Sequence, residues 1–246
     1  MRRLFSIMIA AHLLLAALAA GGAKKPEAQL IRDQAEIRQD KKELQTDQRT
    51  VTDDRMDLDR LSDLVMRWDR LRKSKASSSA IEAVETQIMR ELRRDLAENE
   101  AQAGKAGMEV ERSEKELRRS GREVRKERRD GDHRPGELRD DRRDRRDDRR
   151  DLADDIRDSS EAKELLAKKE ATAAELLALQ RRIDLAGGRM DEVLRREQSS
   201  LLERYLELSE EEIRLGVREI REDHEELKED RKERSEDRRE NRRDRR

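Results

Sequence analysis

An apolar residue recurs at every seventh position near the start of the chain, and this spacing requires a long helix. The repeat consists of Leu30, Ile37, Leu44, Val51, Leu58 and Val65. Seven residues make nearly two helical turns, so these side chains form one stripe. The position three residues after each member holds Asp33, Asp40, Asp47 and Asp54, and then Leu61 and Trp68. We therefore expect a coiled-coil seam that is half polar at first and apolar only towards its end.

The composition agrees with long helices and excludes a thick globular core. Of the 246 residues, 49% are charged and 1% are aromatic, and there is no cysteine. A charged fraction about twice that of globular proteins favours long helices, coiled coils or partial disorder. Without cysteine, neither disulfides nor thiolate metal sites can support the fold.

Breaks in the sequence predict four helices, each about 50 residues or 75 Å long. Pro26 suits the first turn of a helix, and Ser79-Ala80-Ile81-Glu82 resembles a capping box. We expect a signal peptide at 1–23 and an arginine-rich charged tail at 231–246. Between them we expect a helical hairpin at 24–130, with its turn near 74–79, and a second hairpin at 137–230, with its turn near 187–188. A turn at 131–136 would connect the two hairpins.

Apolar residues gather in the halves of the helices that adjoin the turns near 74–79 and 187–188. Short connections favour antiparallel neighbours, so these halves would meet at one end of a bundle. The expected contacts are Leu61 with Leu92, Val65 with Ile88, and Ile183 with Val193. The predicted fold is all-α, a four-helix bundle or pair of coiled-coil hairpins, with one apolar end and charged, partly disordered ends.

Two mirror-image charge stripes flank the turn at 131–136. Folding the chain back there pairs Lys115 with Asp154, Arg118 with Asp151, Arg122 with Asp147, Arg125 with Asp144, and Arg129 with Asp140. Steps of three and four place each stripe on one helix face, so an antiparallel ionic zipper is expected. The alternative is a solvated polyampholyte with no fixed pairing. Exposed pairs contribute only about 0.2–1 kcal/mol each, so the zipper would order a tip and not the whole fold.

The first residues are typical of a secretory signal. Met1-Arg2-Arg3 is followed by a mostly apolar run from Leu4 to Ala20 and then by small residues. The run is short for a membrane anchor, which needs about 20 apolar residues. We expect an exported, periplasmic or secreted protein, with contact to a membrane only through the leader if it stays uncleaved.

No catalytic, metal or cofactor motif stands out. His133 and His224 lie far apart and lack the spacing of metal ligands. No nucleophile elbow and no nucleotide-binding glycine loop is present. The sequence therefore favours a protein that is not an enzyme and that uses no cofactor.

The end of the chain is a candidate anion-binding segment. It contains Arg238, Arg239, Arg242, Arg243, Arg245 and Arg246. Arginine binds phosphate and carboxylate groups through two parallel hydrogen bonds. For an exported chain, an anionic envelope polymer or lipid is a better candidate than nucleic acid, and a solvated charged tail is the alternative.

Together these features favour a non-enzymatic helical protein with a structural or protein-interaction role in the bacterial cell envelope. Self-association through the half-polar seams or binding to a protein partner would carry this role. One alternative is a periplasmic holdase chaperone. The other is a polyanion-binding protein that acts through the arginine tail.

Overall fold

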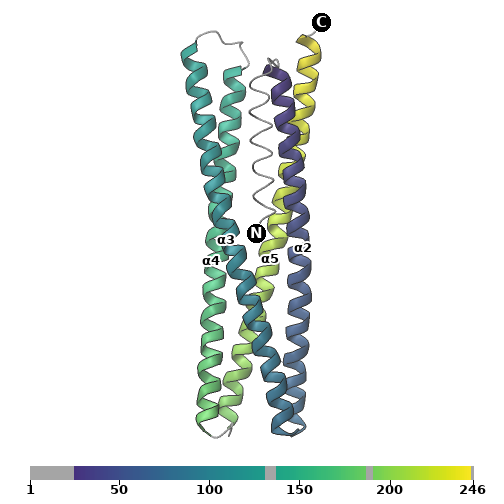
Figure 1. Cartoon of the computed structure of the whole chain (residues 1–246), viewed down its shortest axis with the longest axis vertical. Helices are drawn as coiled ribbons and strands as arrows, with labels where there is room; N and C mark the ends of the chain where they lie inside the picture. The colour runs from purple at the N-terminus through teal and green to yellow at the C-terminus, as the bar shows by residue number, and fades with distance from the viewer. Residues whose placement is uncertain (1–24, 131–136, 187–190, 245–246) are drawn as a thin grey trace, which may run out of the picture. The chain divides into compact units, whose positions relative to one another are not determined.

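The computed structural model describes residues 25–130, 137–186 and 191–244, and its long elements are all helices (Figure 1). They are α2 (Lys25–Lys73), α3 (Ser78–Asp130), α4 (Glu137–Leu185) and α5 (Glu192–Asp244). Within these ranges there is no strand, which confirms the all-α class. The proposed signal peptide at 1–23 and the turns at 131–136 and 187–188 lie outside the described residues. The backbone of α5 is helical through Asp244 and so includes most of the charged tail at 231–246, where partial disorder was expected.

The chain divides into two compact units, which we describe separately. The four-helix unit comprises residues 54–213, and the two-helix unit comprises residues up to 53 together with those from 214 onward. This division does not follow the two consecutive hairpins, because α2 and α5 each pass from one unit into the other. None of the described helices is long and apolar enough to cross a membrane.

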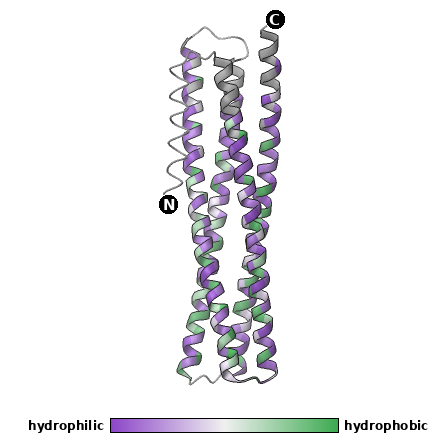
Figure 2. Ribbon diagram, turned by 45° about the vertical axis from the view of Figure 1, so that its right-hand side comes forward, coloured by the Kyte–Doolittle hydropathy of each residue, from purple (hydrophilic) through white to green (hydrophobic). Residues whose placement is uncertain are grey.

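The core of the four-helix unit draws side chains from all four helices. Its buried members are Leu61 and Trp68 on α2; Val84, Ile88 and Leu92 on α3; Ala173, Leu176, Leu179 and Ile183 on α4; and Leu201, Leu202 and Tyr205 on α5. Apolar residues concentrate towards the connections at 74–77 and 186–191, as the colouring of Figure 2 shows. The predicted bundle with an apolar end is therefore confirmed for this unit.

One expected contact in this core is wrong. Ile183 is buried, but Val193 is 70% exposed, and its neighbour Leu194 packs against the core instead. The reason lies at the start of α5. Asp191 accepts a hydrogen bond of 2.8 Å from the backbone N–H of Leu194, so it caps the helix and sets which side chains turn inward.

The connection between α2 and α3 is a tight cap. The N–H of Ala76 bonds to the carbonyl of Leu71, and the N–H of Lys75 bonds to the carbonyl of Arg72, each at 3.0 Å. This pair of bonds defines a Schellman motif, which needs a left-handed residue. Lys75 fills that position with a φ of 52°.

A single tryptophan joins α2 to α3 just before this cap. Trp68 is 2% exposed, and its indole N–H donates to Glu85 at 2.9 Å. Arg72 binds the same carboxylate at 2.8 Å and lies 4.3 Å from the centre of the Trp68 ring. Burial lowers the pKa of Arg72, and Glu85 opposes this effect. The large apolar ring is thus buried with its polar N–H satisfied.

The two-helix unit has a thin seam. Ile37 and Leu44 on α2 are buried with Leu227 on α5, and Ile220 packs against them. The acidic seam positions Asp40 and Asp47 are partly buried, in line with the half-polar pattern. Burial raises the pKa of Asp223 on α5 to about 8, and Asp47, Glu219, Glu226 and Glu43 raise it further. Apolar burial in this unit is therefore offset by carboxyl groups that are also partly removed from water.

Our first prediction concerns the cap. The left-handed conformation costs a residue with a side chain about 1 kcal/mol or more in free energy, and glycine has no such cost. Lys75→Gly should therefore stabilise the protein by about 1 kcal/mol in urea unfolding. Lys73→Gly, two residues earlier and still helical, should instead destabilise it; equal effects of the two variants would contradict this account of the cap.

A second prediction concerns Gly216 in the two-helix unit. A Cβ at this position would lie 2.7 Å from Cγ2 of Val51, which is closer than packing allows. Gly216→Ala should destabilise the protein by about 1–3 kcal/mol through overpacking. Adding Val51→Ala should recover part of that loss, whereas additive losses would count against the contact.

Gly104 and Gly107 are the matched controls for Gly216, because a Cβ at either position meets no atom within 4 Å. Alanine at each should stabilise α3 by about 1 kcal/mol. Helix content by circular dichroism and the urea midpoint check both sets of variants.

Candidate functional site: a buried ionic cluster

The most unusual side chain in the four-helix unit is a fully buried lysine. Lys169 lies on α4, four residues after the buried Leu165 and four before the buried Ala173, so it occupies a position of the apolar stripe. Its exposure is 0%. A lysine without a counter-charge at such a site would be strongly destabilising. The four-helix unit is therefore stable only if Lys169 has partners of opposite charge.

Carboxylates from two other helices bind the Lys169 ammonium. Its Nζ lies 2.9 Å from Oδ2 of Asp95 on α3, and it also donates to Oε2 of Glu212 on α5. The hydroxyl of Tyr205 donates to the same Oδ2 of Asp95 at 2.6 Å. Lys169 also lies 5.5 Å from the centre of the Tyr205 ring. Charge-assisted hydrogen bonds of this kind are directional, so they fix α3, α4 and α5 relative to one another.

Asp54 on α2 completes the cluster. Burial raises its pKa to about 7; Glu212 and Asp95 raise the pKa further, while Lys169 lowers it. The side chain of Gln102 on α3 hydrogen-bonds to Asp54. Burial also raises the pKa of Glu212, an effect that Lys169 opposes. Each of the four helices thus contributes one ionisable group to the cluster.

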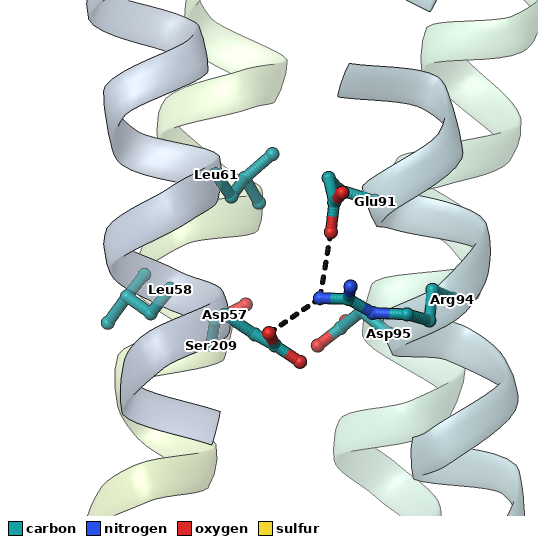
Figure 3. Close-up of a pocket in the computed structure, with 7 residues that line it drawn as sticks. All are labelled: Asp57, Leu58, Leu61, Glu91, Arg94, Asp95 and Ser209. Atoms are coloured by element: carbon teal, nitrogen blue, oxygen red, sulfur yellow. Dashed lines mark ion pairs between the residues drawn. The ribbon is translucent and has the colours of Figure 1, made fainter. Parts of the chain in front are cut away.

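The ion pairs of Arg94 join α2 and α3 beside the cluster (Figure 3). Arg94 binds Asp57 at 2.5 Å and Glu91 at 2.7 Å, and Arg60 lies 3.3 Å from Asp57. A small hollow at this place is lined by Asp57, Leu58, Leu61, Glu91, Arg94, Asp95 and Ser209. It has room for about one water molecule, which is far too little for a small-molecule ligand.

The groups of the cluster bind one another and hold helices together. Burial raises the pKa of Tyr205, and Asp95 raises it further, so the phenol remains a donor and cannot serve as a base. The three carboxyl groups are arranged around an ammonium group. In the described part of the chain, no group of three histidine, cysteine or acidic residues is placed to hold a metal ion. The arrangement can hold helices in register.

The helices that carry the predicted ionic zipper run antiparallel close to the expected register. The hydroxyl of Ser113 on α3 donates to Asp155 on α4, whereas the zipper register would place Ser113 opposite Ile156. This side-chain contact lies one residue from the pairing that the zipper register would give. The small residues Ala103, Ser113 and Gly121 on α3 are all buried.

The zipper residues with described ion pairs make them within their own helices. Lys115 lies 3.9 Å from Glu111 and Arg118 lies 3.0 Å from Glu114, while Asp147 pairs with Arg150 and Asp154 with Arg157. Arg125 donates to the carbonyl of Gly121, and Arg122 and Arg129 are exposed.

The acidic stripe is described only in part. The side chains of Asp140 and Asp144 lie outside the described residues. Burial raises the pKa of Asp151 to about 7, and Asp148, Asp147, Asp155 and Asp154 raise it further. Pairing of the two stripes across the helices remains a prediction.

The candidate anion-binding tail is described only in its backbone and in one of its arginines. Arg239 is exposed. The side chains of Arg238, Arg242, Arg243, Arg245 and Arg246 lie outside the described residues, and anion binding by this segment remains a prediction.

The sequence flagged Asp54 as a seam position but missed Lys169, Asp95 and Glu212 as a site. A signal for them exists, because each stands where its helix's stripe calls for an apolar residue. Asp95 follows Val84, Ile88 and Leu92, and Glu212 follows Leu201, Tyr205 and Leu208. In a chain in which 49% of residues are charged, such an exception does not stand out until the partners are known.

A scan against protein-family models and searches of curated proteins and of solved structures find no match to this chain. Its role must therefore be argued from its own geometry.

The cluster generates a third prediction. Lys169→Met would leave Asp95 and Glu212 buried without their counter-charge, and removal of one partner from a buried ion pair costs about 3–5 kcal/mol. Urea unfolding should show a loss of this size. The neighbouring variant Lys168→Met is the control, because Lys168 is exposed and pairs with Glu164 at the surface, so it should change the midpoint little.

A triple variant separates loss of charge balance from loss of shape. Adding Asp95→Asn and Glu212→Gln to Lys169→Met removes the stranded carboxylates, and it should recover most of the stability. If the triple variant is as unstable as Lys169→Met alone, packing and not charge governs this site.

Proposed function

We propose that this protein is an exported, non-enzymatic helical scaffold of the bacterial cell envelope that works by presenting helix surfaces to a protein partner. The leader at 1–23 supports the exported location, since it has the basic start, apolar run and small residues of a secretory signal. The role itself is supported by how the buried polar groups are used.

The proposal is carried by the way in which the two buried charges Lys169 and Glu212 and the partly buried Asp95 are used. Lys169, Asp95 and Glu212 bond to one another and join three helices. The adjacent hollow has room for about one water molecule. Side chains committed to holding helices together beside so small a space favour a scaffold over an enzyme.

A candidate contact surface lies where α4 ends and α5 begins. Leu185 is 89% exposed and Val193 is 70% exposed, although the buried core of the same unit lies close by along both helices. Apolar side chains left in water next to a core are typical of contact sites for other proteins. The half-polar seam is a weaker candidate for self-association, because Ile37 and Leu44 already pack against Leu227 within the chain.

A fourth prediction tests this surface in cells that produce the full chain. A photo-crosslinking amino acid at Val193 should form a defined adduct in the envelope fraction. The same group at Glu203, an exposed position on α5, is the matched control and should form little adduct. Equal yields at both positions, or none at either, would refute a contact at Val193.

The mass of the adduct identifies the kind of contact. Twice the mass of the chain indicates self-association, and one other defined mass indicates a separate partner. The holdase alternative predicts instead a broad distribution of unfolded clients. It is favoured by the further exposed apolar side chains Met56, Met66, Met108 and Ile156 in the four-helix unit.

A further inference from the structure

The buried cluster of the four-helix unit contains more negative than positive groups. Asp54, Asp95 and Glu212 supply three carboxyl groups, and Lys169 supplies the single ammonium group among them. Lys169 is fully buried and Glu212 is 8% exposed, so water screens these charges weakly. One ammonium group cannot balance three carboxylates in such a place.

Lys169 directs its bonds to two of the three carboxyl groups. It binds Asp95 at 2.9 Å and also binds Glu212, whereas Asp54 receives a hydrogen bond from the neutral side chain of Gln102. The groups that face Asp54 are Asp95 and Gln102 from α3, Lys169 from α4 and Glu212 from α5. Asp54 is therefore the carboxyl group without a positive partner of its own.

Asp54 is partly buried. A carboxylate that is partly removed from water and lacks a counter-charge is relieved most simply by taking up a proton. We propose that Asp54 is a proton-sensitive latch of the four-helix unit. With Asp54 protonated, α2 closes against the other three helices around Lys169. When Asp54 ionises, its repulsion from Asp95 and Glu212 loosens the segment of α2 that begins at this residue.

The sign of the pH effect follows from the proton balance. Asp54 has a pKa of about 7 in the folded unit, well above the pKa of about 3.9 of an aspartate in an unfolded chain. Between these values the folded state holds a proton that the unfolded state has lost. Stability therefore falls as the pH rises through this window, and the full loss is reached above pH 7.

The fifth prediction compares Asp54→Asn with the wild type in urea unfolding at several pH values between 5 and 6.5. Asparagine matches the shape of the protonated aspartate, so the variant should fold. One proton makes the unfolding equilibrium constant rise about tenfold per pH unit, and Asp54→Asn should remove that much of the slope. Other carboxyl groups also make stability depend on pH, and Asp151, whose pKa burial raises to about 7, is one of them. The test is therefore the difference in slope between Asp54→Asn and the wild type.

Asp59→Asn is the matched control, because Asp59 is exposed on the same helix of the same unit and should keep the wild-type slope. An unchanged slope in Asp54→Asn would overturn the proposal.

Hydrogen exchange followed by mass spectrometry supplies a local measure. After correction for the intrinsic rate, peptides covering 54–61 should exchange at least tenfold faster at pH 7.5 than at pH 5.5 in the wild type and at equal rates in Asp54→Asn. Equal protection at both pH values in the wild type would also overturn the latch.

Discussion

The ion pairs of Lys169 are the interaction on which the four-helix unit depends. A lysine that is fully buried is tolerated only because Asp95 and Glu212 lie within bonding distance. These partners come from separate helices, so their positions can be met in only a few arrangements of the bundle. Apolar packing alone constrains register weakly, since aliphatic side chains tolerate small shifts. A buried charge does not, and it ties the apolar core to one register.

The same principle acts in a weaker form throughout the chain. Nearly half of the residues are charged, so charged residues occupy seam positions that apolar residues would normally fill. In the two-helix unit, Asp47 and Asp223 lie near each other where Ile37, Leu44 and Leu227 supply the burial. Each acid at a seam reduces the gain from burial and makes the pairing sensitive to pH. Partial burial of such acids therefore couples packing at the seams to their protonation.

The proposed scaffold role would use apolar side chains that stay exposed beside a buried core. The exposed apolar residues Leu185 and Val193 lie close along their helices to the buried core of the four-helix unit, so a partner bound there would contact side chains next to that core. The proton-sensitive Asp54 lies on another helix of the same unit, and it would alter stability without touching that surface.

The sequence by itself determined the helices, because the seven-residue repeat from Leu30 to Val65 and the breaks near 74–79 and 187–188 are local signals. It also determined that the apolar end of the bundle would form near Leu61, Leu92 and Ile183. Only the tertiary structure decided which charged residues meet inside the four-helix unit. Lys169, Asp95 and Glu212 are far apart in sequence, and charged residues are too common for a pattern to select these three. Which of them meet depends on the rotation and register of the four helices. The start of α5 shows how fine this dependence is, because Leu194 packs against the core and its neighbour Val193 does not.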